Sequence, residues 1–200
     1  AQEYFGVRAD MVTYGKTLGG GLPVGVVCGK PALMKRFRPE RPADICFARG
    51  TFNAHPYVMA AMNVFLRRLD SAEILALYDG QHTRWDARAA GLNQAFEAAG
   101  LPVRVANMAS VWTITYTQPS RYNWMLQFYM RLHGLALSWV GSGRIIFSLN
   151  FRDEDFAQVA LKFLDAARQM CEDGWWLPQA AQSNREIRHS ILKEMLRHRI

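Results

Sequence analysis

A lysine near the N-terminal end of the sequence stands in a setting that suits covalent chemistry. Lys16 follows the apolar run Met11–Tyr14 and precedes the glycine cluster Gly19-Gly20-Gly21. An ordinary lysine amine, with a pKa of about 10.4, is a poor nucleophile at neutral pH, but enclosure by apolar or cationic groups lowers that pKa and enables Schiff-base formation. Glycines also let the backbone approach a flat ligand closely. The pattern indicates an amine that condenses with a carbonyl group; a solvated lysine at a strand end is the alternative.

Two other positions could bind anionic groups. Thr51, after Gly50, lies just ahead of a helix predicted to begin near Pro56, and a helix N-terminus offers free N–H groups and a positive dipole to a phosphate. The alternative for Thr51 is a hydroxyl that serves only the helix entry. Arg144 stands before an apolar run, and its guanidinium could form a structural ion pair with an acidic side chain.

Other catalytic and binding motifs are incomplete. The Gly15-Lys16 pair lacks the glycine that a phosphate loop needs five residues earlier, where Asp10 stands. A dinucleotide-binding motif that starts at Gly19 fails because its third glycine falls on Val24. The five histidines have no metal-ligand spacing, and no G-x-S-x-G motif is present. Nucleotide-binding, metal-dependent and serine-hydrolase functions therefore lose support.

The strands and first helix expected to position these side chains follow from short apolar runs. We expect a loop at 36–42, where prolines and arginines alternate, and a helix over 56–69 with Pro56 in its first turn. Strands are predicted at 11–14 and 24–28, both buried, and at 103–105, 111–116, 135–140 and 145–151.

Helical spacing predicts the rest of the chain. A start resembling a capping box at Asp70–Glu73 predicts one long helix that ends at Gly100, with its core stripe on Leu75, Tyr78, His82, Trp85, Ala89, Leu92 and Phe96. Three further helices are expected. The first has Met125, Phe128 and Leu132 on its buried side. The second starts at Asp153, ends at Gly174 and buries Phe156, Val159, Phe163, Ala166 and Met170. The apolar face of the last consists of Ile187, Ile191 and Met195. Core packing is expected for Trp112, Trp139, Trp175 and Trp176.

Composition sets the class of protein. The 200 residues are 50% hydrophobic and 20% charged, which is typical of a globular chain with a core. No apolar run approaches the roughly 20 residues of a membrane helix. The net charge of +7 comes from residues 30–49 and 183–200, without the motifs of a nucleic-acid-binding protein. Three widely spaced cysteines, Cys28, Cys46 and Cys171, indicate neither disulfides nor a zinc site, so we expect a reducing compartment, the cytoplasm.

Three segments resemble one enzyme family. The segment Asp10–Gly25, DMVTYGKTLGGGLPVG, closely resembles the cofactor-lysine segment of the class III pyridoxal-phosphate aminotransferases, in the branch that contains glutamate-1-semialdehyde 2,1-aminomutase. The segment Gly50–Pro56, GTFNAHP, resembles the second motif of this family, with His55 in place of a frequent asparagine. The stretch Gly141–Phe151, GSGRIIFSLNF, resembles the region where ornithine-type relatives carry a carboxylate-binding arginine.

The resemblance implies a pyridoxal 5'-phosphate enzyme of the α/β fold type I. Lys16 would bind the cofactor as a Schiff base and move protons, Gly50 and Thr51 would bind the cofactor phosphate of the neighbouring subunit, and Arg144 would bind the substrate carboxylate. A homodimer with its active site at the subunit interface follows. The implied activity moves an amino group between an amino-acid-like donor and a carbonyl acceptor; the alternative is an aminomutase of the glutamate-1-semialdehyde type.

The family also implies a domain division. Residues 1–70 would end the cofactor-binding large domain, and residues 71–200 would form the small α/β domain with a basic terminal helix. The family's pyridine-nitrogen aspartate, ring-stacking aromatic residue and first phosphate-binding turn lie upstream of these segments. Because the first residue is not Met, we expect a fragment that does not hold the cofactor alone.

Two other interpretations stay open. The chain could be a non-catalytic interaction module, in which the large-domain remnant and the basic helix bind a partner. It could also belong to an aminotransferase that acts on a substrate tethered to a carrier protein, with the basic stretches at 30–49 or 183–200 docking an acidic carrier domain.

Overall fold

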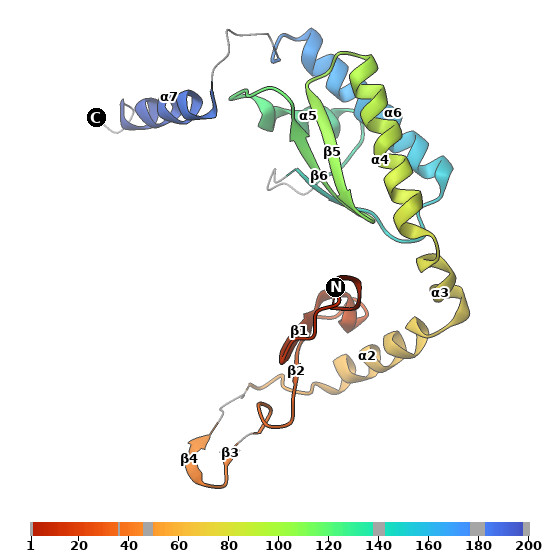
Figure 1. Cartoon of the computed structure of the whole chain (residues 1–200), viewed down its shortest axis with the longest axis vertical. Coiled ribbons are helices and arrows are strands. Elements are labelled where there is room, and N and C mark those ends of the chain that lie inside the picture. Colours follow the sequence, from red (N-terminus) through yellow and green to blue (C-terminus); the bar gives the residue numbers. More distant parts are fainter. Residues whose placement is uncertain (1, 36, 46–49, 138–142, 177–182, 198–200) are drawn as a thin grey trace. The chain divides into compact units, whose positions relative to one another are not determined.

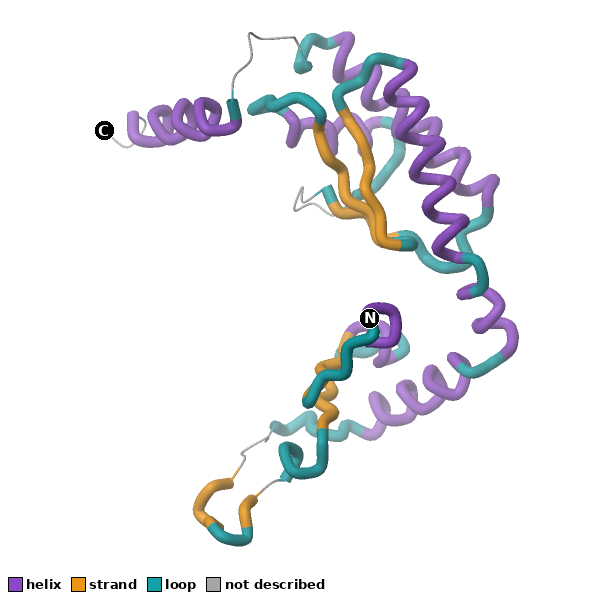
Figure 2. Tube along the Cα trace, in the orientation of Figure 1, coloured by secondary structure: helices purple, strands orange, loops and turns teal. Residues whose placement is uncertain are grey.

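The protein is described here from a computed structural model that covers residues 2–35, 37–45, 50–137, 143–176 and 183–197. The chain divides into two compact units, Ala1–Ala76 and Leu77–Ile200, called the N-terminal and the C-terminal unit below (Figure 1). Both combine helices with small antiparallel sheets, as Figure 2 shows by colour. No helix of the described residues is both long and apolar enough to cross a membrane.

The N-terminal unit starts with a short helix, α1 (Gln2–Phe5), and a hairpin. Strand β1 (Met11–Gly15) pairs antiparallel with β2 (Gly25–Gly29), and Gly15 lies opposite Gly25. Both strands were predicted, but their expected burial is wrong, because only Val12 and Val26 are half-buried. Two strands without a covering layer leave both faces open to water.

The glycine cluster between the strands has a packing role. The 3₁₀ helix η1 (Lys16–Gly19) packs against helix α2 (Pro56–Leu69). A Cβ on Gly20, which has φ +58°, would lie 3.3 Å from the Ala61 carbonyl oxygen of α2. A Cβ on Gly19 would lie 2.9 Å from Val24 Cγ1. Gly19 and Gly20 therefore allow close contact with protein atoms.

The expected loop at 36–42 is instead part of a second hairpin. Strand β3 (Phe37–Arg38) pairs with β4 (Arg41–Ile45), and Arg38 lies opposite Arg41 across a two-residue turn. Pro39 occupies the first central position of that turn, where its fixed φ favours a reversal. Helix α2 has the predicted bounds, with Pro56 in its first turn.

The predicted long helix is wrong: it consists of two helices. Helix α3 (Ala72–Tyr78) ends before Gly80, whose left-handed φ of +61° separates it from α4 (Gln81–Ala98). At the start of α3 the side-chain acceptor is Ser71 Oγ, 3.4 Å from the Ile74 nitrogen. Gly100, with φ +66°, ends α4 as predicted, and the Leu101 N–H donates to the Phe96 carbonyl. Leu75 and Tyr78, expected in the core stripe, are exposed.

The C-terminal unit contains a three-stranded antiparallel sheet in the order β5 (Val103–Met108), β6 (Val111–Tyr116), β7 (Arg144–Ile146). Helix α4 packs against β5 and contacts α6 (Asp153–Glu172), and α5 (Leu126–Leu132), which follows the turn η2 (Asn123–Met125), packs on α6 (Figure 1). The largest fully buried side chains are those of Trp85, Trp112, Phe96, Phe163, Leu126, Met130, Met170 and Val103.

Three details of this unit differ from prediction. The strand expected at 145–151 is shortened to β7, because a turn follows Phe147. Of the strand expected at 135–140, residues 135–137 form no strand and the others lie outside the described residues. Helix α5 buries Leu126 and Met130, while Phe128 and Leu132 are exposed. Residues 126 and 130 share one face, and α6 covers that face rather than the opposite one.

Helix α6 begins at Asp153, as predicted. Its buried face includes Phe156, Phe163, Ala166 and Met170, as predicted, and Gly174 follows its end with φ +82°. Helix α7 (Asn184–Arg197) buries Ile187 alone among its described side chains, so the expected burial of its apolar face is wrong for Ile191 and Met195.

Candidate functional site

Lys16 lies where β1 ends and η1 begins, directly after the Gly15–Gly25 pair. Its backbone has φ +52°, a left-handed conformation that costs a non-glycine residue about 1 kcal/mol or more. The side chain is exposed, so the described residues do not supply the enclosure that the sequence interpretation requires of this amine. The backbone around it is held in place, because η1 packs on α2 through Gly20.

A cavity of about 570 Å³ lies at the N-terminus of the same helix. Gly50 and Thr51 line it, together with the start of β2, and Lys16 is not among its lining residues. The lining also includes Tyr57 and Val58 in the first turn of α2, where N–H groups have no intrahelical acceptor. Gly25, which also lines the cavity, pairs with Gly15, the residue directly before Lys16, so Thr51 and Lys16 belong to one unit.

His55 also lines this cavity. In the sequence, this residue stands out only as a departure from the family pattern. It precedes α2 as its N-cap residue, with no side-chain capping bond. Its Nδ1 atom is buried and has no hydrogen-bond partner among the described residues. The imidazole lies between the rings of Phe52 and Tyr57, whose centroids are 6.1 and 5.3 Å away.

The donor groups of this cavity fit a phosphate. A threonine hydroxyl, first-turn N–H groups and an imidazole nitrogen without a protein partner can all donate to phosphate oxygens, and the helix dipole favours their negative charge. The primary amine of Lys16, three donors without an acceptor when protonated, fits an aldehyde once it has lost its proton. The chemistry of these residues therefore suits pyridoxal phosphate.

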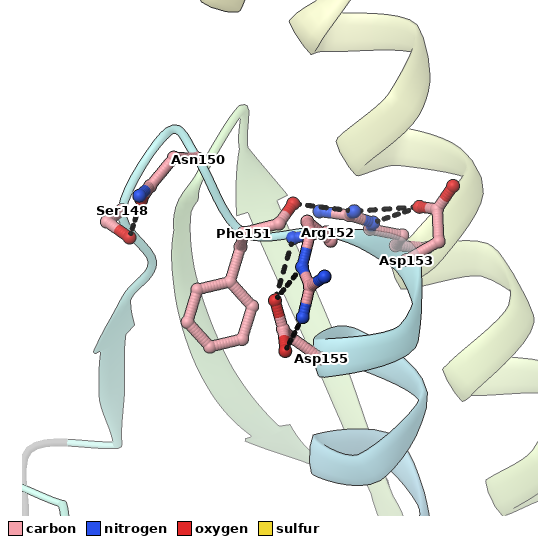
Figure 3. A network of polar contacts seen from close by, with 7 residues as sticks. Ser148, Asn150, Phe151, Arg152, Asp153 and Asp155 are labelled. Atoms are coloured by element: carbon pink, nitrogen blue, oxygen red, sulfur yellow. Dashed lines mark hydrogen bonds and ion pairs between the residues drawn. The ribbon is translucent and has the colours of Figure 1, made fainter.

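Arg144 lies in the C-terminal unit, at the first position of β7 and opposite Thr113 of β6. Its side chain is exposed at the edge of the sheet. The segment that follows leads into α6 and is fixed at several points (Figure 3). Ser148 Oγ donates to Asn150 Oδ1 (2.7 Å) at the turn.

Arg88 of α4 is the buried charge that holds this segment, and the sequence interpretation missed it. Its side chain is 7% exposed and donates to Asp153 Oδ1 (2.7 Å) and to the Phe151 carbonyl (2.9 Å). The guanidinium carbon lies 4.4 Å from the ring centroid of Trp85 and 5.2 Å from that of Phe156. Arg88 lies three residues after Trp85, a member of the predicted core stripe, and this helical spacing could have indicated that Arg88 is buried.

Charged groups at the start of α6 are also paired. The Arg152 guanidinium donates to both carboxylate oxygens of Asp155, and these hydrogen bonds lower the pKa of that carboxyl. Asp155 also accepts from the Arg152 backbone N–H, so its carboxylate satisfies a backbone donor at the start of α6. Figure 3 shows both arginine–aspartate contacts at the start of α6. They hold the end of the segment that connects α6 to β7, the strand that carries Arg144.

The aromatic residues near β6 belong to the core. Trp112 and Trp176 are 1% and 6% exposed, which confirms the predicted packing role for these two; Trp139 lies outside the described residues. Burial raises the pKa of Tyr116 to about 12, and its hydroxyl donates to the Asn123 carbonyl (2.8 Å). At neutral pH this phenol is a protonated structural donor.

Comparison with known proteins identifies the family. Residues 1–167 match the family profile "Aminotransferase class-III". The chain is 31% identical over 182 residues to glutamate-1-semialdehyde 2,1-aminomutase of Nitratidesulfovibrio vulgaris (strain DP4), covering 85% of this chain and 40% of that protein. It is 34% identical over 116 residues to the protein of the same name from Methanococcus maripaludis (strain C7), covering 58% of this chain and 26% of that protein. The chain thus spans less than half the length of these relatives.

Solved structures share the fold. One described as "Transaminase with PLP bound" has a TM-score of 0.71 at 24% identity and covers 87% of this chain and 41% of its own. A β-phenylalanine aminotransferase from Variovorax paradoxus has a TM-score of 0.69 at 23% identity and covers 90% of this chain and 42% of its own. The expected fold type I architecture is confirmed, and so is the resemblance drawn from the sequence motifs. The chain belongs to the class III aminotransferases.

Proposed function

We propose that the protein to which this chain belongs transfers amino groups with pyridoxal phosphate bound covalently to Lys16. The observation that carries this proposal is the placement of Lys16 at φ +52° on a turn that packs against α2, in the one segment where the family motif and the exposed amine coincide. When bound, pyridoxal phosphate supplies an aldehyde that condenses with amines and a ring that withdraws electrons.

Lys16 has two roles in this proposal. Its Nζ would hold the cofactor, and once an amino substrate has replaced it, the free amine would accept the proton of the substrate carbon and later donate it. Positioned proton transfer of this kind contributes on the order of 10²–10⁴ in rate. The backbone next to Lys16 packs on α2, which positions the start of its side chain.

Thr51 and the N-terminus of α2 bind the phosphate in this proposal, with His55 Nδ1 as a further donor. In the homodimer that we propose, this cavity serves the cofactor of the second subunit. Phe52 and Tyr57 beside the cavity are 78% and 76% exposed, an apolar surface that suits burial in a homodimer interface. We assign the substrate carboxylate to Arg144, which can bind it through two hydrogen bonds.

A location in the cytoplasm is also proposed, because Cys28 and Cys171 are free thiols. The related activity of an aminomutase is a second candidate, favoured by the glutamate-1-semialdehyde 2,1-aminomutases among the relatives. Product analysis with a labelled amino group separates the two. An aminotransferase passes the nitrogen to a separate carbonyl acceptor, whereas an aminomutase returns it to the adjacent carbon of the same molecule.

The test of the covalent role uses the full-length enzyme with pyridoxal phosphate. Reduction with borohydride, followed by proteolysis and mass spectrometry, should place the cofactor adduct on Lys16. The variant Lys16→Ala should lose the adduct and about 10²–10⁴ in rate, while Lys30→Ala, a change of another exposed lysine in the same unit, should retain both. An adduct on a different lysine would overturn the proposal.

A further inference from the structure

Helix α7 differs from the rest of the chain in its relation to the family. The family match ends at residue 167, and α7 begins at Asn184. Its start is specified locally: Ser183 N–H and Oγ donate to Glu186 Oε2 (2.7 and 2.9 Å), and the Glu186 N–H donates back to Ser183 Oγ (3.3 Å). This capping box lowers the pKa of Glu186, with the backbone N–H of Ser183 as its main cause. The helix is therefore a defined element beyond the matched region.

One side of α7 is fixed to the C-terminal unit. Ile187 is 8% exposed, and one turn from the C-terminal end Arg121 donates to both oxygens of Glu194 (2.7 and 2.6 Å). The two contacts lie seven residues apart, which is two helical turns, so they mark the same face. The opposite side of α7 is left for other contacts.

The charges of that opposite side are positive. Both acidic residues of α7 are engaged within the chain, Glu186 by Ser183 and Glu194 by Arg121. Four cations, Arg185, Arg188, Lys193 and Arg197, are exposed, and none of them forms an ion pair within the described residues. A surface of this kind attracts a partner that carries negative charge.

Part of the exposed surface of α7 is apolar. Ile191, Leu192, Met195 and Leu196 are 36%, 55%, 56% and 58% exposed. Ile191 lies one turn after Ile187 and Met195 one turn after Ile191, beside the contact face, and Leu192 and Leu196 continue the stripe toward the opposite side, where Lys193 and Arg197 border it. Apolar side chains that remain in contact with water form a surface that gains stability when it is covered.

We propose that the α7 stripe, Ile191, Leu192, Met195 and Leu196 with the bordering cations Lys193 and Arg197, docks an acidic amphipathic helix of a partner protein. The partner supplies aliphatic side chains to the stripe and carboxylates to the cations. Pairing of two α7 helices is disfavoured, because it would bring like charges together. A membrane surface is the competing occupant for a basic amphipathic helix, and the vesicle arm of the test below distinguishes it from a partner protein.

The test measures binding to the full-length protein by fluorescence anisotropy. The probes are two labelled synthetic helices with the same leucine spacing, one with glutamate and one with lysine at the flanking positions. Vesicles of phosphatidylcholine and phosphatidylserine form the third arm, read by co-sedimentation. We expect binding of the glutamate helix that weakens as salt is raised, and affinity for the lysine helix at least about tenfold lower.

A matched pair of double variants locates the surface. Leu192→Asp/Lys193→Glu changes the α7 stripe, and Leu161→Asp/Lys162→Glu makes the same changes on α6, where Leu161 is 53% exposed. Only the α7 variant should lose affinity for the glutamate helix, by about tenfold or more, with the cofactor content of both variants unchanged. Equal losses in both variants, equal binding of both helices, vesicle binding without helix binding, or self-association that depends on α7 would each overturn the proposal.

Discussion

Charged residues have two different roles in this chain, structural and functional, and Arg88 has a structural role. Its guanidinium is almost fully buried, and its Nη1 atom has no partner among the described residues. Asp153, its counter-ion, is 82% exposed. The two members of the pair therefore differ in what their removal leaves behind.

We predict that Asp153→Asn destabilises the protein more than Arg88→Met does. Loss of the carboxylate leaves a buried cation without its counter-charge and should cost about 1–3 kcal/mol, whereas methionine fills the space between Trp85 and Phe156 without a charge. The double variant should be no less stable than Arg88→Met alone. Urea unfolding followed by tryptophan fluorescence measures this. Glu154→Gln, at the next position of α6, is the control, and a larger loss for Arg88→Met would contradict the prediction.

Arg144 represents the functional kind of charge in the proposed enzyme. Arg144→Met should raise KM about 10- to 100-fold for amino donors that carry a carboxylate and leave simple amines unaffected, because a simple amine has no carboxylate for the guanidinium to bind. Arg104→Met changes another exposed arginine of the same sheet and should affect neither substrate. Steady-state kinetics with matched donor pairs measures the difference. An equal loss for both classes of donor would refute the assignment of Arg144.

At the scale of elements, the contact between η1 and α2 depends on Gly20, whose packing role is visible only in the structure. Gly20→Ala should destabilise the protein by about 1–3 kcal/mol, because φ is +58° and the new Cβ would press on the Ala61 carbonyl. Gly91→Ala is the contrasting change, within α4 and with no atom near its Cβ, and should stabilise by about 0.5–1 kcal/mol. Thermal unfolding of both variants checks the signs. A stabilising Gly20→Ala would show that the turn does not need this backbone conformation.

Local signals in the sequence predicted some elements well. Pro56, Gly100 and Gly174 mark helix ends through backbone conformations that depend on a few neighbours, and those ends were found. The face of α5 was wrong because Phe128 and Leu132 are as apolar as Leu126 and Met130, and only α6 decides which pair is covered. The break at Gly80 was missed because the apolar spacing continues across it.

The candidate site was predictable only where its residues belong to local sequence motifs. Lys16 and Thr51 belong to contiguous motifs, whereas Arg88 acts through Asp153, 65 positions later in the chain. A contact over that distance leaves no local pattern. The exposure of Lys16 was likewise unpredictable, because enclosure depends on what covers the β1–β2 hairpin.

At the scale of the whole molecule, the proposed homodimer, in which Thr51 binds the cofactor phosphate of the neighbouring subunit, predicts sharing of sites between subunits. The Lys16→Ala and Thr51→Val variants should both be impaired, the first in rate and the second in cofactor affinity. When the two variants are mixed, partially unfolded and refolded together, they should regain up to about a quarter of wild-type activity, because half of the dimers are hybrids and each hybrid has one intact site. Activity of the mixture against protein ratio measures this. No recovery, with hybrid dimers demonstrated by mass, would place both residues in the site of one subunit.

The left-handed backbone of Lys16 has a consequence for how this position evolved. For stability alone, glycine would be favoured at this position, since it adopts φ +52° without steric cost. The chain instead has a lysine there, which makes the turn locally less stable. Such a trade-off between stability and activity is expected where a side chain is selected for its reactivity, and it makes Lys16→Gly a replacement that removes the amine while relaxing the turn.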